Sequence, residues 1–146
     1  MIFGMHVKSF ENYIKEQNQE VISFDFDDTI NELQWDAEEG DYVRDNNGHI
    51  VGNLDKKIAK LIFKYHNDGK KVVIVTSRLD SAVDEIREFV KKHNLPIQEI
   101  YNTNMEPKLF TLERIKASTH YDDDIEEIRP LKSSGIKGIH IKRYDK

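Results

Sequence analysis

Cysteine is absent from the 146 residues of this chain. The chain therefore offers no disulfide, no thiolate nucleophile and no cysteine-ligated zinc site. No apolar run is long enough for a membrane span, and the first residues lack the apolar stretch of a signal peptide. These absences lead us to expect a soluble, cytoplasmic protein without a membrane partner, while its oligomeric state stays open.

Basic residues are in the minority, with 22 against 27 acidic residues and a formal net charge of −5. General affinity for duplex nucleic acid comes chiefly from basic surface, so this class of function is disfavoured. A local basic surface stays open, because Lys56, Lys57, Lys60 and Lys64 share one predicted helix. Charged helix faces are, however, usually just solvated.

Short apolar segments alternate with segments of helical spacing along the chain. The pattern predicts strands near 21–26, 72–76, 97–101, 118–121 and 137–141, and helices near 55–67, 81–93, 107–116 and 125–131. A further helix is expected within residues 1–18. The alternation predicts an α/β fold, with a five-stranded parallel sheet and helices on both faces, in a single domain over residues 1–146.

The first predicted strand ends abruptly in acids, in the run Val-Ile-Ser-Phe-Asp-Phe-Asp-Asp-Thr-Ile at 21–30. Ligands of open α/β sheets bind beyond the carboxyl ends of the strands, so Asp25 and Asp27 should converge on one pocket. Two like charges at ~4 Å repel by about 4 kcal/mol at an effective dielectric of ~20. Mg²⁺ relieves this repulsion and prefers carboxylate, water and phosphate oxygens. The run predicts a magnesium site, with a solvated acidic turn as the alternative.

The strand predicted near 72–76 ends in Thr76, Ser77 and Arg78. Hydroxyls and backbone N–H groups can hold phosphate oxygens without adding charge, and a guanidinium can add a bidentate fork. A plain strand-to-helix loop is the alternative interpretation, and it is as good for Ser77 as the functional one.

A lysine and a second acidic strand end follow. Lys108 comes directly after Pro107, at the predicted start of an amphipathic helix. The run Thr-His-Tyr-Asp-Asp-Asp at 119–124 is a short strand that closes in Asp122, Asp123 and Asp124 before the next helical spacing begins. Acids at a helix N-terminus are also favoured by the macrodipole, by ~0.3 to 1 kcal/mol each, so Asp124 needs no function to explain it.

These four motifs, in this order, resemble those of the haloacid dehalogenase superfamily, most of whose members are Mg²⁺-dependent phosphohydrolases. The resemblance implies that Asp25 attacks phosphorus and forms an aspartyl-phosphate, with Asp27 as general acid and then general base. It also implies that Thr76 orients the phosphate oxygens, while Lys108 and Arg78 offset the phosphoryl charge.

The resemblance further implies a set of metal ligands and a set of substrate contacts. Asp25, Asp27 and Asp123 would hold Mg²⁺, and Asp122 would orient a water or the motif lysine. If the strand runs one residue longer, Asp123 and Asp124 take these two roles instead. The implied substrate contacts are Asp28, through its backbone, and Thr76, Ser77, Arg78 and Lys108.

Residues 31 to 53 interrupt the alternation of strands and helices. The stretch from 41 to 51 predicts a β-hairpin, with Asn47-Gly48 supplying the positive φ of its turn. In the resembling family a flap occupies this position, and here it is too short for a cap domain, so we expect a capless enzyme with an open site. Candidates for gripping a nucleotide, or else for anchoring the flap, are Trp35, Tyr42, Arg44 and His49.

The capless plan and the Thr-Ser-Arg turn are similar to the 3′-phosphatase part of polynucleotide kinase-phosphatases. The expected substrate is therefore a nucleotide or a nucleic-acid end, with sugar phosphates and other phosphorylated small molecules as competitors. A phosphoacceptor signalling module needs a different motif order, since residue 101, where its acceptor Asp would follow the third strand, is Tyr. A non-catalytic binding module is the other alternative, but every residue expected for catalysis is present.

Overall fold

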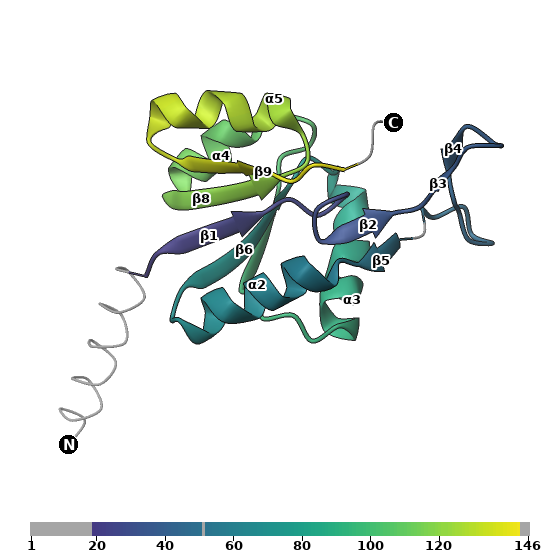
Figure 1. The fold of residues 1–146 in the computed structure, drawn as a ribbon, viewed down its shortest axis with the longest axis horizontal. Helices are drawn as coiled ribbons and strands as arrows, with labels where there is room; N and C mark the ends of the chain where they lie inside the picture. Colours follow the sequence, from purple (N-terminus) through teal and green to yellow (C-terminus); the bar gives the residue numbers. More distant parts are fainter. Residues whose placement is uncertain (1–18, 51, 144–146) are drawn as a thin grey trace, which may run out of the picture.

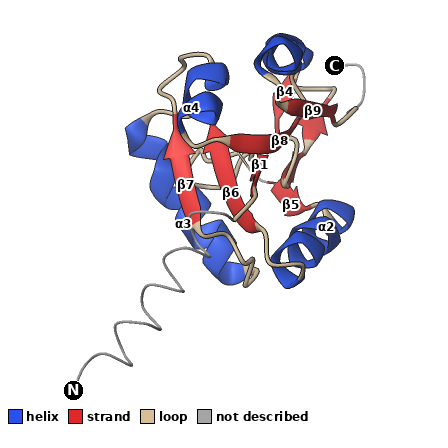
Figure 2. Cartoon of the chain, turned by 90° about the vertical axis from the view of Figure 1, so that its left-hand side faces the viewer, coloured by secondary structure: helices blue, strands red, loops and turns tan. Residues whose placement is uncertain are grey.

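The computed structural model describes residues 19 to 50 and 52 to 143. The helix expected within residues 1–18 lies outside this part of the chain. Five parallel strands form the central sheet, in the spatial order β7, β6, β1, β8, β9 (Figures 1 and 2). Their bounds are β1 Val21–Phe24, β6 Lys71–Thr76, β7 Glu99–Asn102, β8 Ala117–Asp122 and β9 Lys137–His140.

Helices cover both faces of this sheet, as Figures 1 and 2 show. The α-helices are α2 Lys56–Asn67, α3 Val83–Lys92, α4 Lys108–Arg114 and α5 Ile125–Ile128, and the 3₁₀ helices are η1 Asp80–Ala82 and η2 Arg129–Ser134. Side chains of a strand alternate between faces. Val72 and Ile74 of β6 therefore join a core with α2 and α3, whereas Val73 and Val75 join a core with α4. This arrangement confirms the predicted α/β class.

The ends of the helices follow from local chemistry. Asp55 caps α2, because its carboxylate accepts hydrogen bonds from the backbone N–H groups of Lys57 and Ile58. Gly69, with φ of 82°, follows the helix in the left-handed conformation, as its position in the sequence predicts. The helix predicted near 125–131 instead changes to 3₁₀ geometry after four residues, because Pro130 has no N–H to continue the α-helical bonds.

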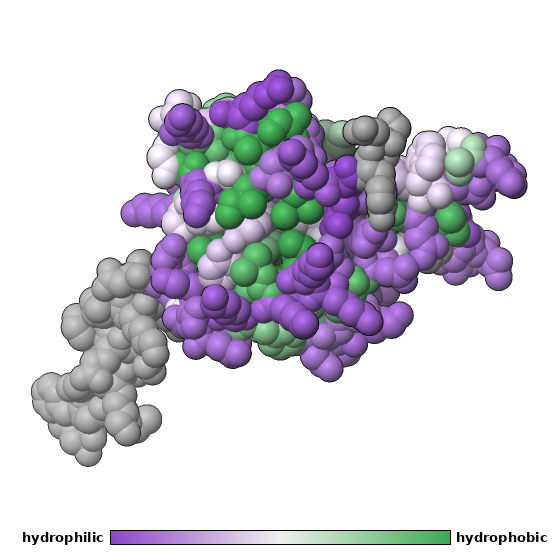
Figure 3. Space-filling view, viewed as in Figure 1, coloured by the Kyte–Doolittle hydropathy of each residue, from purple (hydrophilic) through white to green (hydrophobic). Residues whose placement is uncertain are grey.

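The flap between β1 and α2 contains two short antiparallel pairs. In the first pair, β2 Asn31–Leu33 lies against β5 Gly52–Leu54 and joins the flap to the body. In the second, β3 Trp35–Asp36 lies against β4 Asp41–Tyr42. The visible surface of the flap, at the right of Figure 3, is mainly hydrophilic.

The predicted hairpin at 41–51 is only partly right. Its turn is present, since Gly48 has φ of 81° and its N–H donates to the Asp45 carbonyl, and an isolated bridge joins Arg44 to Ile50. Asp41 and Tyr42, however, pair backward with β3 rather than forward. The Asp36 carboxylate explains this, because it accepts the N–H groups of two following residues and so closes a turn at 36–40.

The described part of the chain has the flap but no further inserted domain between the strands of the sheet. None of its helices has both the length and the apolar character needed to cross a membrane.

Candidate active site

A cleft of ≈ 460 Å³ lies at the carboxyl ends of β1 and β8, beside the flap. This is the edge of the sheet at which a ligand of an open α/β fold is expected. Its lining residues are Asp25, Asp27, Asp28, Leu33, Tyr42, Ser77, Lys108, Asp122, Asp123, Asp124, Ile125 and Glu127. The cleft thus brings together most of the site residues that the sequence predicts.

A tight turn after β1 places the first group of acids. The Phe26 carbonyl accepts hydrogen bonds from the N–H groups of Thr29, Ile30 and Asn31, at 3.2, 3.0 and 2.9 Å. Asp28, inside this turn, has φ of 60°, a conformation uncommon for residues other than glycine. Such strained positions are concentrated at functional sites, where the surrounding structure compensates for their cost.

Lys108 is the only basic residue among the described residues that line the cleft, and it is buried between two carboxylates. Its Nζ donates to Asp25 Oδ1 at 2.8 Å and to Asp122 Oδ2 at 2.7 Å. Carboxylate oxygens of Asp25, Asp122 and Asp123 all lie within 4.8 Å of one another. One lysine cannot balance three carboxylates, and an all-oxygen donor set is the kind that Mg²⁺ takes. These three residues therefore fit a divalent cation.

The three carboxyl groups differ in acidity. Burial raises the pKa of Asp25 well above its usual value, against the opposing charge of Lys108. Burial and the charge of Asp122 likewise raise the pKa of Asp123. Burial acts in the same direction on Asp122, but hydrogen bonding from His120 and the charge of Lys108 outweigh it and lower this pKa to about 2. Lys108 lowers the pKa of both Asp25 and Asp122, and His120 adds a second donor to Asp122 alone. A cation would favour ionisation of Asp25 and Asp123.

Two buried residues behind the cleft were not predicted from the sequence. His120 Nε2 lies 2.8 Å from Asp122 Oδ2, and His120 Nδ1 lies 2.8 Å from Ser23 Oγ. Because Asp122 is ionised, Nε2 carries the proton and Nδ1 accepts from the serine hydroxyl. Burial lowers the pKa of His120, which keeps the ring neutral. The spacing of His120 and Asp122, two residues apart on one strand, is the signal that indicates a shared face.

Asp27 lines the cleft but is bound by Arg78. The guanidinium donates Nε to Asp27 Oδ2 and Nη2 to Asp27 Oδ1, both at 2.8 Å. Its remaining Nη1 donates to the Ala82 carbonyl and to Glu85 Oε2. Arg78 therefore lies outside the cleft and is occupied by protein groups, rather than presenting the free fork expected from the sequence.

Thr76 is also withdrawn from the cleft. It is 1% exposed, and its Oγ1 accepts a hydrogen bond from the N–H of Arg78 at 3.3 Å. The neighbouring Ser77 lines the cleft instead. Of the Thr-Ser-Arg motif, only the middle residue faces the space where a ligand would lie.

The second acidic run divides after Asp122, the last residue of β8. Asp123 belongs to the three-carboxylate group, whereas Asp124 does not. Asp124 caps α5 through a hydrogen bond from the N–H of Glu126 at 3.0 Å. Glu127 is a further residue that the sequence did not indicate, and its carboxylate accepts the N–H of Lys108 at 3.0 Å, which fixes the start of α4.

Among the four flap candidates, only Tyr42 lines the cleft. The ring of Trp35 packs edge-on against the ring of Tyr42, with the two ring centroids 5.1 Å apart. Arg44 is bound within the flap, to the Asp41 carboxylate and the Gly48 carbonyl. The fourth candidate, His49, faces Glu85 of α3 at 3.6 Å.

No family model matches the sequence, and no curated protein matches it either. Solved structures are similar in fold. A chain of the Pnkp1/Rnl/Hen1 RNA repair complex matches with a TM-score of 0.66 and 12% identity, over 88% of this chain and 44% of that chain. The present chain thus spans less than half of that protein.

Two phosphatases of 3-deoxy-D-manno-octulosonate 8-phosphate also match. The Moraxella catarrhalis enzyme, solved with magnesium, phosphate and KDO, has a TM-score of 0.51 and 16% identity, over 86% of this chain and 69% of that chain. The cobalt-bound Haemophilus influenzae enzyme has a TM-score of 0.51 and 14% identity, over 83% and 68%. At these identities the likeness shows the fold alone, which this chain shares with these two phosphatases.

Proposed function

We propose that this chain is a Mg²⁺-dependent phosphomonoester hydrolase that works through an aspartyl-phosphate on Asp25. The observation that carries the proposal is the group of Asp25, Asp122 and Asp123 around Lys108, at the strand ends where a ligand binds. Two buried carboxylates and a half-buried third beside one lysine are costly unless a cation completes them. The fold likeness to phosphatases supports the same reaction class.

In the proposed reaction Asp25 attacks phosphorus and the bond to the leaving oxygen breaks, with Asp27 giving that oxygen a proton. Water then attacks the phosphorus of the aspartyl-phosphate, Asp27 takes the proton of the water, and Asp25 and inorganic phosphate are released. The covalent route divides one difficult step into two easier ones. Lys108 stays beside Asp25 throughout and offsets the negative charge that gathers there.

Mg²⁺ would supply further positive charge beside the phosphoryl oxygens. We propose Asp25, Asp122 and Asp123 as the carboxylates that hold it. This set keeps the pair Asp122 and Asp123 and sets aside the pair with Asp124, which caps a helix. It also leaves out the Asp27 carboxylate, which faces Arg78.

Arg78 determines how Asp27 can act. With both oxygens bound, the Asp27 carboxylate is held at the edge of the cleft, where a leaving group would depart. The proton that Asp27 takes from water in the second step is the one it donates in the first step of the next turnover. Both transfers require that one of the two bonds to Arg78 opens, so that an oxygen of Asp27 is free to carry the proton.

The proposed substrate is a nucleotide or the 3′-phosphate end of a polynucleotide, turned over in the cytoplasm. The described residues form no cap over the cleft, so a long substrate can enter. The first turn of α2 lies beside the site, because Arg143 joins its capping residue Asp55 to the turn that follows Asp25. A polynucleotide strand that extends out of the cleft would therefore meet α2.

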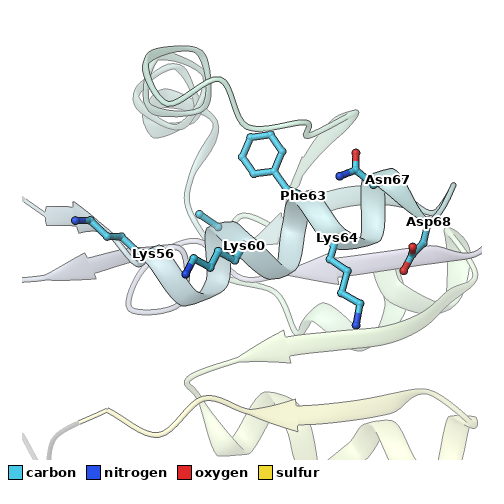
Figure 4. Close-up of a pocket in the computed structure, with 7 residues that line it drawn as sticks. Lys56, Lys60, Phe63, Lys64, Asn67 and Asp68 are labelled. Atoms are coloured by element: carbon cyan, nitrogen blue, oxygen red, sulfur yellow. The ribbon is translucent and has the colours of Figure 1, made fainter.

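The face of α2 that such a strand would meet is basic. A hollow of ≈ 570 Å³ there is lined by Lys56, Lys60 and Lys64, with Phe63 beside them (Figure 4). Asp68 lines the same hollow, but in the described part of the chain no ion pair joins any of the three lysines to an acid. Unpaired lysines can meet backbone phosphates, and an exposed aromatic ring can stack on a base.

A sugar phosphate is the second candidate, because two of the similar folds belong to phosphatases of a sugar phosphate. The test compares kcat/KM for a 3′-phosphorylated oligonucleotide, the matching mononucleotide and a sugar phosphate, each with Mg²⁺ at low and moderate salt. The oligonucleotide should be hydrolysed at least as efficiently as the mononucleotide and should show the steeper fall with salt. Asp25→Asn should remove all three activities.

A matched pair of variants tests the role of α2. Changing Lys56, Lys60 and Lys64 together to glutamine should lower only the oligonucleotide kcat/KM and should flatten its salt dependence. The control changes three exposed lysines elsewhere to glutamine, at 91, 116 and 132. A strong preference for the mononucleotide, with equal salt sensitivity, would contradict the polymer substrate and leave the phosphatase reaction standing. No turnover of any phosphomonoester would contradict the proposed function itself.

A further inference from the structure

Arg143, close to the carboxyl end of the chain, contacts the turn that carries Asp25. Its Nε donates to the Asp28 carbonyl at 2.6 Å, and its Nη2 donates to the Thr29 carbonyl at 2.8 Å. The same Nη2 lies 2.8 Å from Asp55 Oδ2. The side chain is 15% exposed, so this guanidinium is largely enclosed by the groups that it binds.

These contacts add a side-chain link between the turn after β1 and α2, which are also joined by the hydrogen bond that the Asp55 N–H donates to the Ile30 carbonyl at 2.9 Å. The other oxygen of Asp55, Oδ1, caps α2 by accepting two backbone N–H groups. The guanidinium therefore ties the turn after β1 to the first turn of α2. A rigid planar fork with several donors suits this task, whereas the single ammonium group of a lysine does not reproduce it.

The chain just before Arg143 contacts the second acidic strand end. The N–H of Ile141 donates to the Asp122 carbonyl at 2.8 Å, and His140 Nε2 lies 2.9 Å from the Asp123 carbonyl. Residues 140–143 therefore touch the backbone of both acidic segments of the cleft. They do so from behind, since none of them lines the cleft.

Thr29 connects Arg143 to the reacting carboxylate. Its carbonyl accepts from Arg143, and its hydroxyl donates to Asp25 Oδ2 at 3.3 Å. Asp25 Oδ1 is bound by Lys108, so the position of Thr29 decides how the other oxygen is oriented. Asp28, the other residue held by Arg143, has the positive φ of 60° that the turn must maintain.

We propose that Arg143 is a positioning residue, which holds the turn at Asp28 and Thr29 so that Asp25 keeps the orientation needed for cation binding and attack. It does not touch the substrate and acts only through the backbone and through Thr29. The effect on turnover rests on the proposed function. The effect on Mg²⁺ affinity depends only on the carboxylate group.

The test compares wild type, Arg143→Ala, Arg143→Lys and the control Arg129→Ala, which removes an exposed arginine paired with Glu126. Mg²⁺ affinity is measured by calorimetric titration of the metal-free proteins, and kcat and KM are measured on a 3′-phosphorylated substrate. Loss of a residue that orients metal ligands typically costs 10–100-fold in affinity or activity. We expect losses of this size for Arg143→Ala, mainly in kcat, with smaller losses for Arg143→Lys and none for Arg129→Ala.

A second readout separates positioning from general support of the fold. Free methylguanidine should restore part of the Mg²⁺ affinity of Arg143→Ala, because it can occupy the space of the missing fork, and should leave wild type unchanged. Mg²⁺ affinity and kcat of Arg143→Ala within twofold of wild type would overturn the inference. If Arg143→Ala does not fold, Arg143→Lys decides, and wild-type affinity in that variant overturns it equally.

The outcomes also separate this inference from the proposed function. If the wild-type protein binds Mg²⁺ but hydrolyses no phosphomonoester, the proposed function is refuted. The Mg²⁺ affinities of wild type and of the Arg143 variants still test the role of Arg143. A wild-type protein that binds no Mg²⁺ would defeat both.

Discussion

Replacing Asp25 by asparagine should stabilise the metal-free protein while it removes activity. The side chain is 5% exposed and lies with two other carboxylates beside one lysine. Asparagine keeps its shape, and the amide oxygen can still accept the hydrogen bond from Lys108. The change removes one negative charge from a group that has too many.

The size of the effect follows from the distances. At an effective dielectric of ~20, two carboxylates no more than 4.8 Å apart repel by at least about 3.5 kcal/mol, and Asp25 has two such neighbours. The same law gives an attraction of about 6 kcal/mol between Asp25 and Lys108 at 2.8 Å. The repulsions exceed the attraction by at least about 1 kcal/mol. Burial of the charge adds to this difference in the same direction.

The dependence on pH gives the prediction a second readout. The pKa of Asp25 is raised in the folded state, so the folded protein holds this proton more tightly than the unfolded chain does. Its contribution to stability is complete below the unfolded pKa of 3.8 and is lost as the pH rises through the folded pKa. Asp122, with a pKa of about 2, acts in the opposite direction and loses its contribution as the pH falls from about 4 toward 2. Wild type should therefore lose stability with rising pH more steeply than Asp25→Asn does.

Urea and thermal unfolding in EDTA measure the difference, with Asp84→Asn as an exposed control. About 1 kcal/mol corresponds to an increase in Tm of roughly 2–4 °C for a domain of this size. Addition of Mg²⁺ should raise the stability of wild type more than that of Asp25→Asn. If Asp25→Asn is less stable than wild type in EDTA, the idea of an excess of negative charge is refuted. If Asp25→Asn hydrolyses substrate as fast as wild type, Asp25 is not the nucleophile.

Three further predictions concern neighbouring side chains. Asp27→Asn should lower kcat by about 10² to 10⁴-fold in initial-rate assays, as expected for a general acid and base, and a loss below tenfold would contradict that role. Asp123→Ala should raise the Mg²⁺ concentration for half-maximal activity more than Asp124→Ala, which should instead lose about 1 kcal/mol of unfolding free energy with its helix cap. The reverse ranking would move the metal site by one residue. His120→Ala should destabilise the protein in urea by at least about 1.5–3 kcal/mol, because Asp122 loses a buried donor. An unchanged midpoint would show that this contact does not stabilise the fold.

The sheet and its helices were predictable because each is marked by a local pattern. The run Lys-Val-Val-Ile-Val-Thr of β6 is apolar on both faces, as expected of a parallel strand buried between two helical layers. The pairing of β3 with β4 could not be predicted in this way. Strands of two residues, such as Trp35–Asp36, are too short to show any periodicity.

The same distinction, between features with a local pattern and contacts between distant segments, applies to the candidate site. Residues at strand ends are brought to one edge by the topology, so the meeting of Asp25 with Asp122 and Asp123 follows from their positions in the sequence. The partners of arginines depend on distances in the folded chain. Arg78 binds a carboxylate 51 residues away, and Arg143 binds a carbonyl 115 residues away, with no local signal for either.

The pairing of β2 with β5 makes the flap an exchangeable part. Among the described residues, β2 and β5 form the regular strand pair at the base of the flap, so the chain leaves and re-enters the body at nearly the same point. Residues 34 to 50 can therefore change in length and composition without moving the sheet. Gly52, which belongs to the paired strand β5, is restricted instead, because a Cβ there would lie 2.0 Å from Asn31 Oδ1 and the side chain of Asn31 would have to move. The loop beside the cleft can in this way be exchanged while the acids at the strand ends keep their positions.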